Sequence, residues 1–308
     1  MTTPTATEHE LRFPCFGTTV TARVSHPDEG IAADALDRVR DALTDVHVRL
    51  TRFEPGSELS RLNADPRGHV PAGPLLRRFA DAVRHAGRLS DGLVDATLLD
   101  AVEAAGYRHD LSRLPTTAPR RSAAATGTGA WAAVRSDERH VIRPPGVRLD
   151  SGGLGKGLAA DIAAEILSGL PAWAIDCAGD LRMGGSARVR RLVTITSPYD
   201  RDRTIHDLHI TTGAIATSGV TRRTWRSDDG RTAHHLIDPR TGEPARTGIV
   251  QATALAPTGL EAEIRAKTAL LSGPLRAHRA LPRGGAFVTD DGELHLVPAH
   301  RRLRFTRR

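Results

Sequence analysis

The order of strand and helix patterns along the chain constrains its fold more than any other feature. A segment with alternating apolar and β-branched residues over 11–24, interrupted at Gly17, predicts an N-terminal strand. Apolar residues at helical spacing predict helices over residues 31–50, 75–89, 98–106 and 260–271. Further strand patterns occupy residues 173–177, 189–196, 208–212, 233–237 and 248–256. Because strands and helices do not alternate strictly, we expect an α+β fold with mostly antiparallel sheets and packed helices.

Length and composition are compatible with one domain over residues 1–308, built from two lobes. Residues 57–63 and about 112–129 are expected as loops, and residues 299–308 as a basic tail. No stretch approaches the roughly 20 apolar residues that a membrane span requires. The first ten residues lack the basic start and apolar stretch of a secretory signal, so we expect a cytoplasmic protein. The oligomeric state stays open.

The net charge of +7 raises the question of nucleic-acid binding. The basic residues are spread along the chain and are not interleaved with aromatic residues, so we expect no nucleic-acid partner and consider an anionic small ligand instead. Of 43 basic residues, Lys occurs only at Lys156 and Lys267. Lys is a compact point charge whereas Arg is a broad planar fork, so these two positions indicate a tight pocket beside a phosphate. Chance survival of the two lysines is the alternative.

A glycine-rich stretch, DSGGLGKG, occupies residues 150–157, where a predicted strand ends and a predicted helix over 155–167 begins. Glycines let a backbone approach a ligand, and a helix N-terminus presents N–H groups to an anion. The stretch differs from a Walker A loop, which requires Gly at the place of Asp150 and Ser or Thr at the place of Gly157. It therefore predicts phosphate binding, with a tight strand–helix turn as the alternative.

The stretch HHLIDPRTG occupies residues 234–242. A His side chain can take up a proton near neutral pH, and an Asp can orient it or accept a hydroxyl proton. The pattern could also bind a metal, but neighbouring residues of a strand point to opposite faces. One of His234 and His235 is therefore expected to be structural or exposed.

Glu263 and Lys267 lie four residues apart in the predicted helix over 260–271 and so share one of its faces. A solvated ion pair at this spacing, worth about 0.3–0.5 kcal/mol, is the simplest interpretation.

These stretches, in this order, resemble the ApbE-like family of FAD:protein FMN transferases over residues 16–273. The remaining matches are residues 16–19 (FGTT), 57–63 (SELSRLN), 91–97 (DGLVDAT), 176–180 (DCAGD) and 216–219 (ATSG). The resemblance implies an ApbE-like, T-fold-like architecture with a central FAD cleft. It also implies FAD as the substrate and transfer of FMN to a Thr or Ser hydroxyl of an acceptor protein, with release of AMP. Hydrolysis of FAD to FMN and AMP, or FAD binding without catalysis, are the alternatives.

The resemblance also implies roles for individual residues. His235 takes the place of the catalytic base, with Asp238 supporting it. The expected flavin or nucleotide contacts are Phe16, Gly17, Thr18, Ser57, Asn63, Asp95, Gly153, Lys156, Asp180, Thr217, Ser218 and Lys267.

The family's Mg²⁺ motif is altered in this chain. Family members ligate the metal through an Asp, a Thr four residues later and a carbonyl of the glycine-rich turn. Here Glu263 stands at the Asp position, Lys267 at the Thr position and Gly155 in the turn. A protonated ammonium cannot ligate a metal. The hypothesis is that Lys267 supplies part of the positive charge that Mg²⁺ would give, with Glu263 orienting it.

The acceptor motif of the family, Asp-x-x-Thr/Ser-Gly-Ala-Thr/Ser, does not occur in this chain. We therefore expect the acceptor to be another protein rather than the chain itself.

Overall fold

The computed structural model describes residues 7–109, 117–118, 129–227 and 230–299. The expected loop at 112–129 and the basic tail at 299–308 thus lie almost entirely outside the described residues. An eight-stranded sheet in the order β1-β2-β7-β8-β11-β16-β17-β18 dominates the fold, and each neighbouring pair is antiparallel. Its strands are Glu8–Cys15, Thr18–Ser25, Ala172–Cys177, Asp180–Gly184, Gly213–Gly219, Ile249–Ala256, Gly285–Thr289 and Leu294–Val297, in chain order. The expected α+β fold with mostly antiparallel sheets is confirmed.

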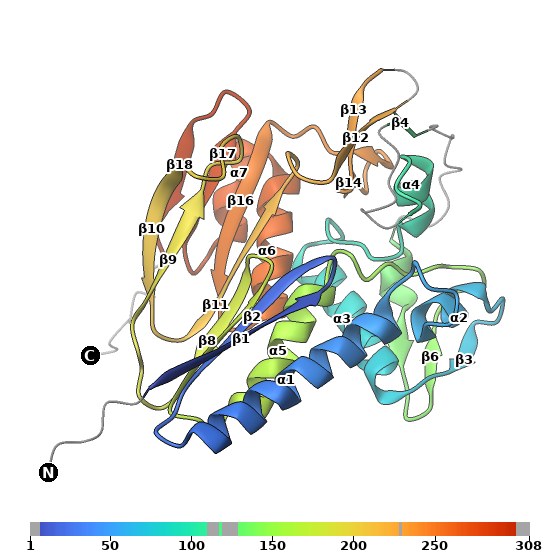
Figure 1. Cartoon of the computed structure of the whole chain (residues 1–308). Helices are drawn as coiled ribbons and strands as arrows, with labels where there is room; N and C mark the ends of the chain where they lie inside the picture. Colours follow the sequence, from blue (N-terminus) through green and yellow to red (C-terminus); the bar gives the residue numbers. More distant parts are fainter. Residues whose placement is uncertain (1–6, 110–116, 119–128, 228–229, 300–308) are drawn as a thin grey trace, which may run out of the picture.

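Three helices cover one face of this sheet (Figure 1): α1 (Glu29–Leu50), α5 (Gly155–Leu167) and α6 (Gly259–Ser272). The hairpin of β9 (Arg191–Thr196) and β10 (Thr204–Ile210) packs against the other face. Alternate side chains of β7 serve the two faces, because successive residues of a strand point to opposite sides. Ile175 belongs to the core under the helices, and Ala174 to the core under the hairpin.

Smaller elements extend the fold at the end that carries the 150–157 turn. They are α2 (Glu58–Ala64), β3 (His69–Pro71), α3 (Pro74–Leu89), α4 (Leu99–Ala104), β4 (Thr117–Ala118), β5 (Arg135–Ser136), β6 (His140–Ile142), β12 (Thr224–Ser227), β13 (Thr232–His234), β14 (Ile237–Asp238), β15 (Glu243–Pro244) and α7 (Pro274–Ala277). Two short 3₁₀ helices, Ala130–Ala133 and His278–Ala280, complete the described elements. No helix within the described residues is both long and apolar enough to cross a membrane.

Two local expectations need correction. The predicted strand over residues 11–24 is a hairpin, which turns at Phe16 and Gly17 with φ of 55° and 70°. Residues 57–63 were expected as a loop, but most of them form helix α2. Ser57 caps this helix, because its hydroxyl accepts a hydrogen bond from the Ser60 N–H at 2.9 Å. A Ser before a short apolar periodicity is the signal that identifies such a helix start.

Helices α5 and α6 cross in backbone contact. A Cβ placed on Gly157 would lie 2.6 Å from the carbonyl oxygen of Gly259, and a Cβ on Gly259 would lie 2.7 Å from that of Gly157. This close approach brings Glu263 of α6 to the start of α5, where its Oε2 accepts a hydrogen bond from the Gly157 N–H at 2.8 Å. Gly157, the second glycine of the GKG sequence, is thus required by the packing of the two helices.

We expect Gly157→Ala to destabilise the protein by about 1–3 kcal/mol, because the added methyl group must displace the α6 backbone. Gly169→Ala is the matched control, since a Cβ there meets nothing within 4 Å. Urea unfolding of both variants measures the difference, and equal stabilities would argue against the backbone contact.

Candidate functional site

One cleft collects most of the residues singled out in the sequence. It encloses about 1310 Å³, counted with its open mouth, and is formed by the β1–β2 turn, the end of α1, residues 93–98, Tyr107, the turn before α5, residues 235–237 and α6. Apolar side chains line one part, among them Leu50, Phe53, Leu98 and Leu154. Lys156, Arg223, His235 and Lys267 give the other part its charge and polarity. A cleft of this kind suits a ligand with flat apolar groups and an anionic centre.

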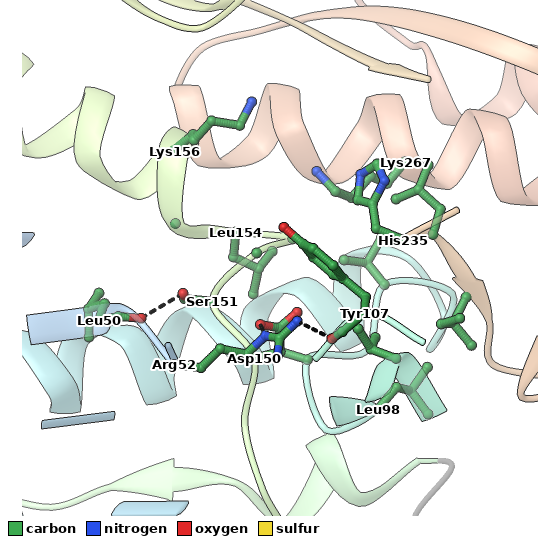
Figure 2. A pocket seen from close by; sticks show the side chains of 18 of the residues that line it. Leu50, Arg52, Leu98, Tyr107, Asp150, Ser151, Leu154, Lys156, His235 and Lys267 are labelled. Carbon is green, nitrogen blue, oxygen red and sulfur yellow. Dashed lines mark hydrogen bonds and ion pairs between the residues drawn. The ribbon is translucent and has the colours of Figure 1, made fainter. Parts of the chain in front are cut away.

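The glycine-rich turn is fixed to the rest of the fold by hydrogen bonds. The Ser151 hydroxyl donates to the Leu50 carbonyl at 2.7 Å (Figure 2), and the Asp150 N–H donates to the Ala96 carbonyl at 2.8 Å. Gly153 lies against the stem of Lys267, whose Cε would be 3.7 Å from a Cβ on that glycine. The turn therefore has a defined position beside the Lys267 ammonium.

Both lysines of the chain line this cleft, and each is paired with a buried carboxylate. Lys156 Nζ lies 2.5 Å from Asp180 Oδ2, and Lys267 Nζ lies 2.8 Å from Glu263 Oε1. Burial lowers the pKa of Lys156, but Asp180 and Glu263 outweigh this effect and raise the pKa above its ordinary value. Lys156 is therefore protonated at neutral pH. Burial raises the pKa of the Glu263 carboxyl, and Lys267 opposes that shift.

His235 presents a neutral imidazole to the cleft. Figure 2 shows it beside Lys267, with Tyr107 close by. Burial, reinforced by the charges of Arg223 and Lys267, holds the pKa of His235 well below 6.5. Its buried Nδ1 has no hydrogen-bond partner among the described residues. The ring therefore has a nitrogen lone pair available to accept a proton.

His234 is the structural member of the pair. Its Nε2 lies 2.9 Å from the Ala245 carbonyl oxygen, and its Nδ1 accepts a hydrogen bond from the Leu236 N–H at 3.3 Å. It is buried away from the cleft that His235 lines. One of the two imidazoles is therefore structural, as expected, but the reason differs from the expected strand alternation, because strand β13 ends at His234 and His235 lies just beyond it.

The structure brings some of the predicted site residues to the cleft and leaves others outside its lining. Those that line it are Phe16, Gly17, Asp95, Gly153, Gly155, Lys156, His235 and Lys267. Those that do not are Thr18, Ser57, Asn63, Asp180, Thr217, Ser218, Asp238 and Glu263.

The residues outside the lining have local partners instead. The Asn63 side chain exchanges two hydrogen bonds with the backbone of Leu149, at 2.7 and 2.8 Å, and so supports the segment that leads into the glycine-rich turn. Thr217 is bonded to Thr253 within the sheet at 2.8 Å, while Ser218 is buried in β11 and Thr18 is exposed at the start of β2. Asp180 and Glu263 lie behind the lysines that they bind.

Asp238 orders its own turn. Its Oδ1 accepts hydrogen bonds from the Arg240 N–H at 2.9 Å and from Arg240 Nε at 2.8 Å, and its Oδ2 accepts one from Nη2 at 2.7 Å. Burial raises the pKa of Asp238, but Arg240 outweighs it and the pKa falls below its ordinary value. The carboxylate is thus engaged with Arg240, and its role beside His235 stays a prediction.

Among the cleft residues that the sequence analysis did not single out are Arg52, Tyr107 and Arg223. The Arg52 guanidinium lies over the rings of Phe53 at 4.3 Å and Tyr107 at 4.8 Å. Its Nε lies 3.1 Å from Asp150 Oδ1, which ties this group to the glycine-rich turn. They come from separate segments with no shared motif, so only the folded chain identifies them.

The residues at the family's Mg²⁺ position do not fit a metal. Both oxygens of Glu263 are engaged, one by the Gly157 N–H and the other by the Lys267 ammonium, each at 2.8 Å. Gly155 is the first residue of α5, where a carbonyl oxygen is directed into the helix. No group of three or more His, Cys, Asp or Glu side chains is placed to hold a metal within the described parts of the chain.

We expect Glu263→Gln to lower the free energy of unfolding by about 3 kcal/mol, because it leaves the Lys267 ammonium buried without a counter-charge. Glu261→Gln is the matched control, since Glu261 pairs with Arg265 at 2.7 Å on the same helix but is more exposed. That control should cost less than about 1 kcal/mol. Urea denaturation measures both, and similar losses would mean that burial adds nothing to the Glu263 pair.

Known proteins are similar to this chain over most of its length. The model of the ApbE family matches residues 16–286. The FAD:protein FMN transferase of Escherichia coli (strain K12) is 26% identical over 296 residues, which cover 90% of this chain and 83% of that protein. The one of Klebsiella pneumoniae (strain 342) is 29% identical over 304 residues, covering 92% and 84%.

Solved structures share the fold. The ApbE protein from Thermotoga maritima has a TM-score of 0.82 at 24% identity, covering 94% of this chain and 97% of that chain. The flavin transferase ApbE from Vibrio cholerae has a TM-score of 0.77 at 22% identity, with the same coverage, 94% and 97%.

Proposed function

The chain belongs to the ApbE family, and on that premise we propose that it transfers FMN from FAD to a Thr or Ser hydroxyl of an acceptor protein and releases AMP. The observation that carries this proposal is the convergence of a neutral His235 with Lys156 and Lys267 in one partly apolar cleft. Relatives named FAD:protein FMN transferase, similar over most of the chain, support the same reaction.

The lining of the cleft suits the two halves of FAD. Flat ring systems favour apolar and aromatic surroundings, which Leu50, Phe53, Leu98 and Tyr107 provide. The diphosphate between the rings requires positive charge and N–H groups, which the lysines and the start of α5 offer. We therefore place the diphosphate at the charged end, beside Lys156 and Lys267.

The proposed reaction is a phosphoryl transfer, in which the protein mainly positions reactants and neutralises charge. The imidazole of His235 accepts the proton of the acceptor hydroxyl. The hydroxyl oxygen bonds to the phosphorus of the FMN half, and the bond from that phosphorus to the bridging oxygen breaks. AMP leaves with the bridging oxygen and its electron pair. No step is assigned to Mg²⁺, because the donor set at Glu263 and Lys267 does not fit a metal.

The proposal includes an acceptor protein in trans, since the chain lacks the family's acceptor motif. It also retains the cytoplasm as the expected compartment. Cys15 and Cys177 are both free and buried, which suits a reducing environment.

Incubation of the purified protein with FAD and a peptide containing the acceptor motif tests the function. Mass spectrometry should detect covalent FMN on the peptide and one AMP for each transfer. His235→Asn should reduce the rate at least about 100-fold, whereas His209→Asn, an exposed histidine of β10, should not. Free FMN with AMP would instead identify an FAD diphosphatase, and unchanged bound FAD a binding protein.

The pH dependence of transfer should reflect the lowered pKa of His235. A base whose pKa is lowered stays unprotonated as the pH falls, so kcat/KM should hold through pH 6.5 and decline only below it. Arg223→Leu removes a cation that helps to lower this pKa, and it should move the decline to higher pH. A wild-type profile that already declines above pH 6.5 would contradict His235 as the base.

A further inference from the structure

We infer that Lys267 and Arg223 together provide the positive charge that a divalent cation provides in the family's usual site, so that this chain binds and cleaves the FAD diphosphate without a metal. The inference rests on the proposed function and assigns two residues of this chain to it.

The Lys267 ammonium is held in place by its counter-charge. Glu263 accepts one of its hydrogen bonds at 2.8 Å, and the other oxygen of Glu263 is fixed by the backbone of Gly157. An ammonium has three donors, so the pairing with Glu263 leaves donors for a ligand in the cleft that Lys267 lines. The absence of a side chain at Gly153, whose Cβ would lie 3.7 Å from Lys267 Cε, keeps open the space beside the stem. A fixed ammonium of this kind is a compact point charge that can neutralise part of the charge of a phosphate.

Arg223 supplies a second cation to the cleft lining, from the segment just before β12. Its φ of 57° lies in the left-handed region, which residues with a side chain adopt at a cost. It lines the cleft, and its charge helps to lower the pKa of His235 and opposes the rise in the pKa of Lys156. Within the described residues it forms no salt bridge, in contrast to both lysines. Its charge is therefore uncompensated before the ligand binds.

The charge balance of the cleft favours an anion without help from a metal. The pairs of Lys156 with Asp180 and Lys267 with Glu263 are each neutral overall, and His235 is neutral. Arg223 then gives this group of side chains a net positive charge, and we put the diphosphate beside them. Arg52 and Asp150, which also line the cleft, pair with each other, and Asp95 lines it as well. Positive groups around a water-poor cleft act more strongly on a phosphate than the same groups in water.

Ligand binding separates this role from a merely structural one. Metal-free protein, prepared with EDTA, is titrated with FAD and with riboflavin, which has the same ring system but no phosphate. Lys267→Met and Arg223→Met should each weaken FAD binding about 10- to 100-fold and leave riboflavin binding unchanged. Arg222→Met is the matched control, because Arg222 is the exposed neighbour of Arg223 and does not line the cleft. It should bind both ligands as wild type does.

Transfer to the acceptor peptide is then compared in EDTA and in Mg²⁺. Similar wild-type transfer rates in the two conditions would support the inference, provided that Lys267→Met and Arg223→Met weaken the binding of FAD but not of riboflavin. A strict requirement for Mg²⁺, or equal weakening of FAD and riboflavin, would overturn it while the proposed function stands. A wild-type protein that binds FAD in neither condition would refute the proposed function itself.

Discussion

The carboxylate of Glu263 connects the parts on which the site depends. It is fully buried on α6, where it accepts a hydrogen bond from the first turn of α5 and binds the Lys267 ammonium. A buried carboxylate is costly unless both oxygens are satisfied, and here each oxygen has a donor. One donor is the backbone N–H of Gly157 and the other is the Lys267 ammonium, which lines the cleft. Glu263 therefore links the packing of α5 and α6 to the charge of the cleft.

The two lysines acquire a common explanation in the folded chain. In a sequence that uses Arg for nearly all of its 43 basic residues, both remaining lysines reach one cleft and both bind buried carboxylates. An Arg fork is larger and would not fit between the glycine-rich turn and these carboxylates as a single point charge. Their shared place in the cleft, each beside a buried carboxylate, favours a requirement for Lys at these two positions over chance survival.

Much of the fold was predictable from the sequence, because the spacing of apolar residues in long segments such as α1, α3 and α6 indicates a helix. Strands β8 and β11, both in the middle of the large sheet, were not predicted, since short segments with Gly and polar residues carry little periodicity. For the site, the family resemblance pointed to His235 and both lysines. It could not separate ligand-facing residues from Asn63 and Ser57, whose polar groups bind backbone, because motif membership does not report which way a side chain is directed. Arg223 depends on a backbone conformation that no local pattern indicates.

The contact between Gly157 and Gly259 has a consequence for how such a site can evolve. Because neither glycine has a side chain, main-chain atoms meet at this point of the crossing and limit how closely the helices that carry Lys156 and Lys267 approach. The spacing of α5 and α6 at this contact therefore does not depend on which side chains the two helices present to the cleft. Substitutions at positions such as 263 and 267, one helical turn apart on α6, can therefore change the charge of the cleft while the main-chain contact between the helices stays the same.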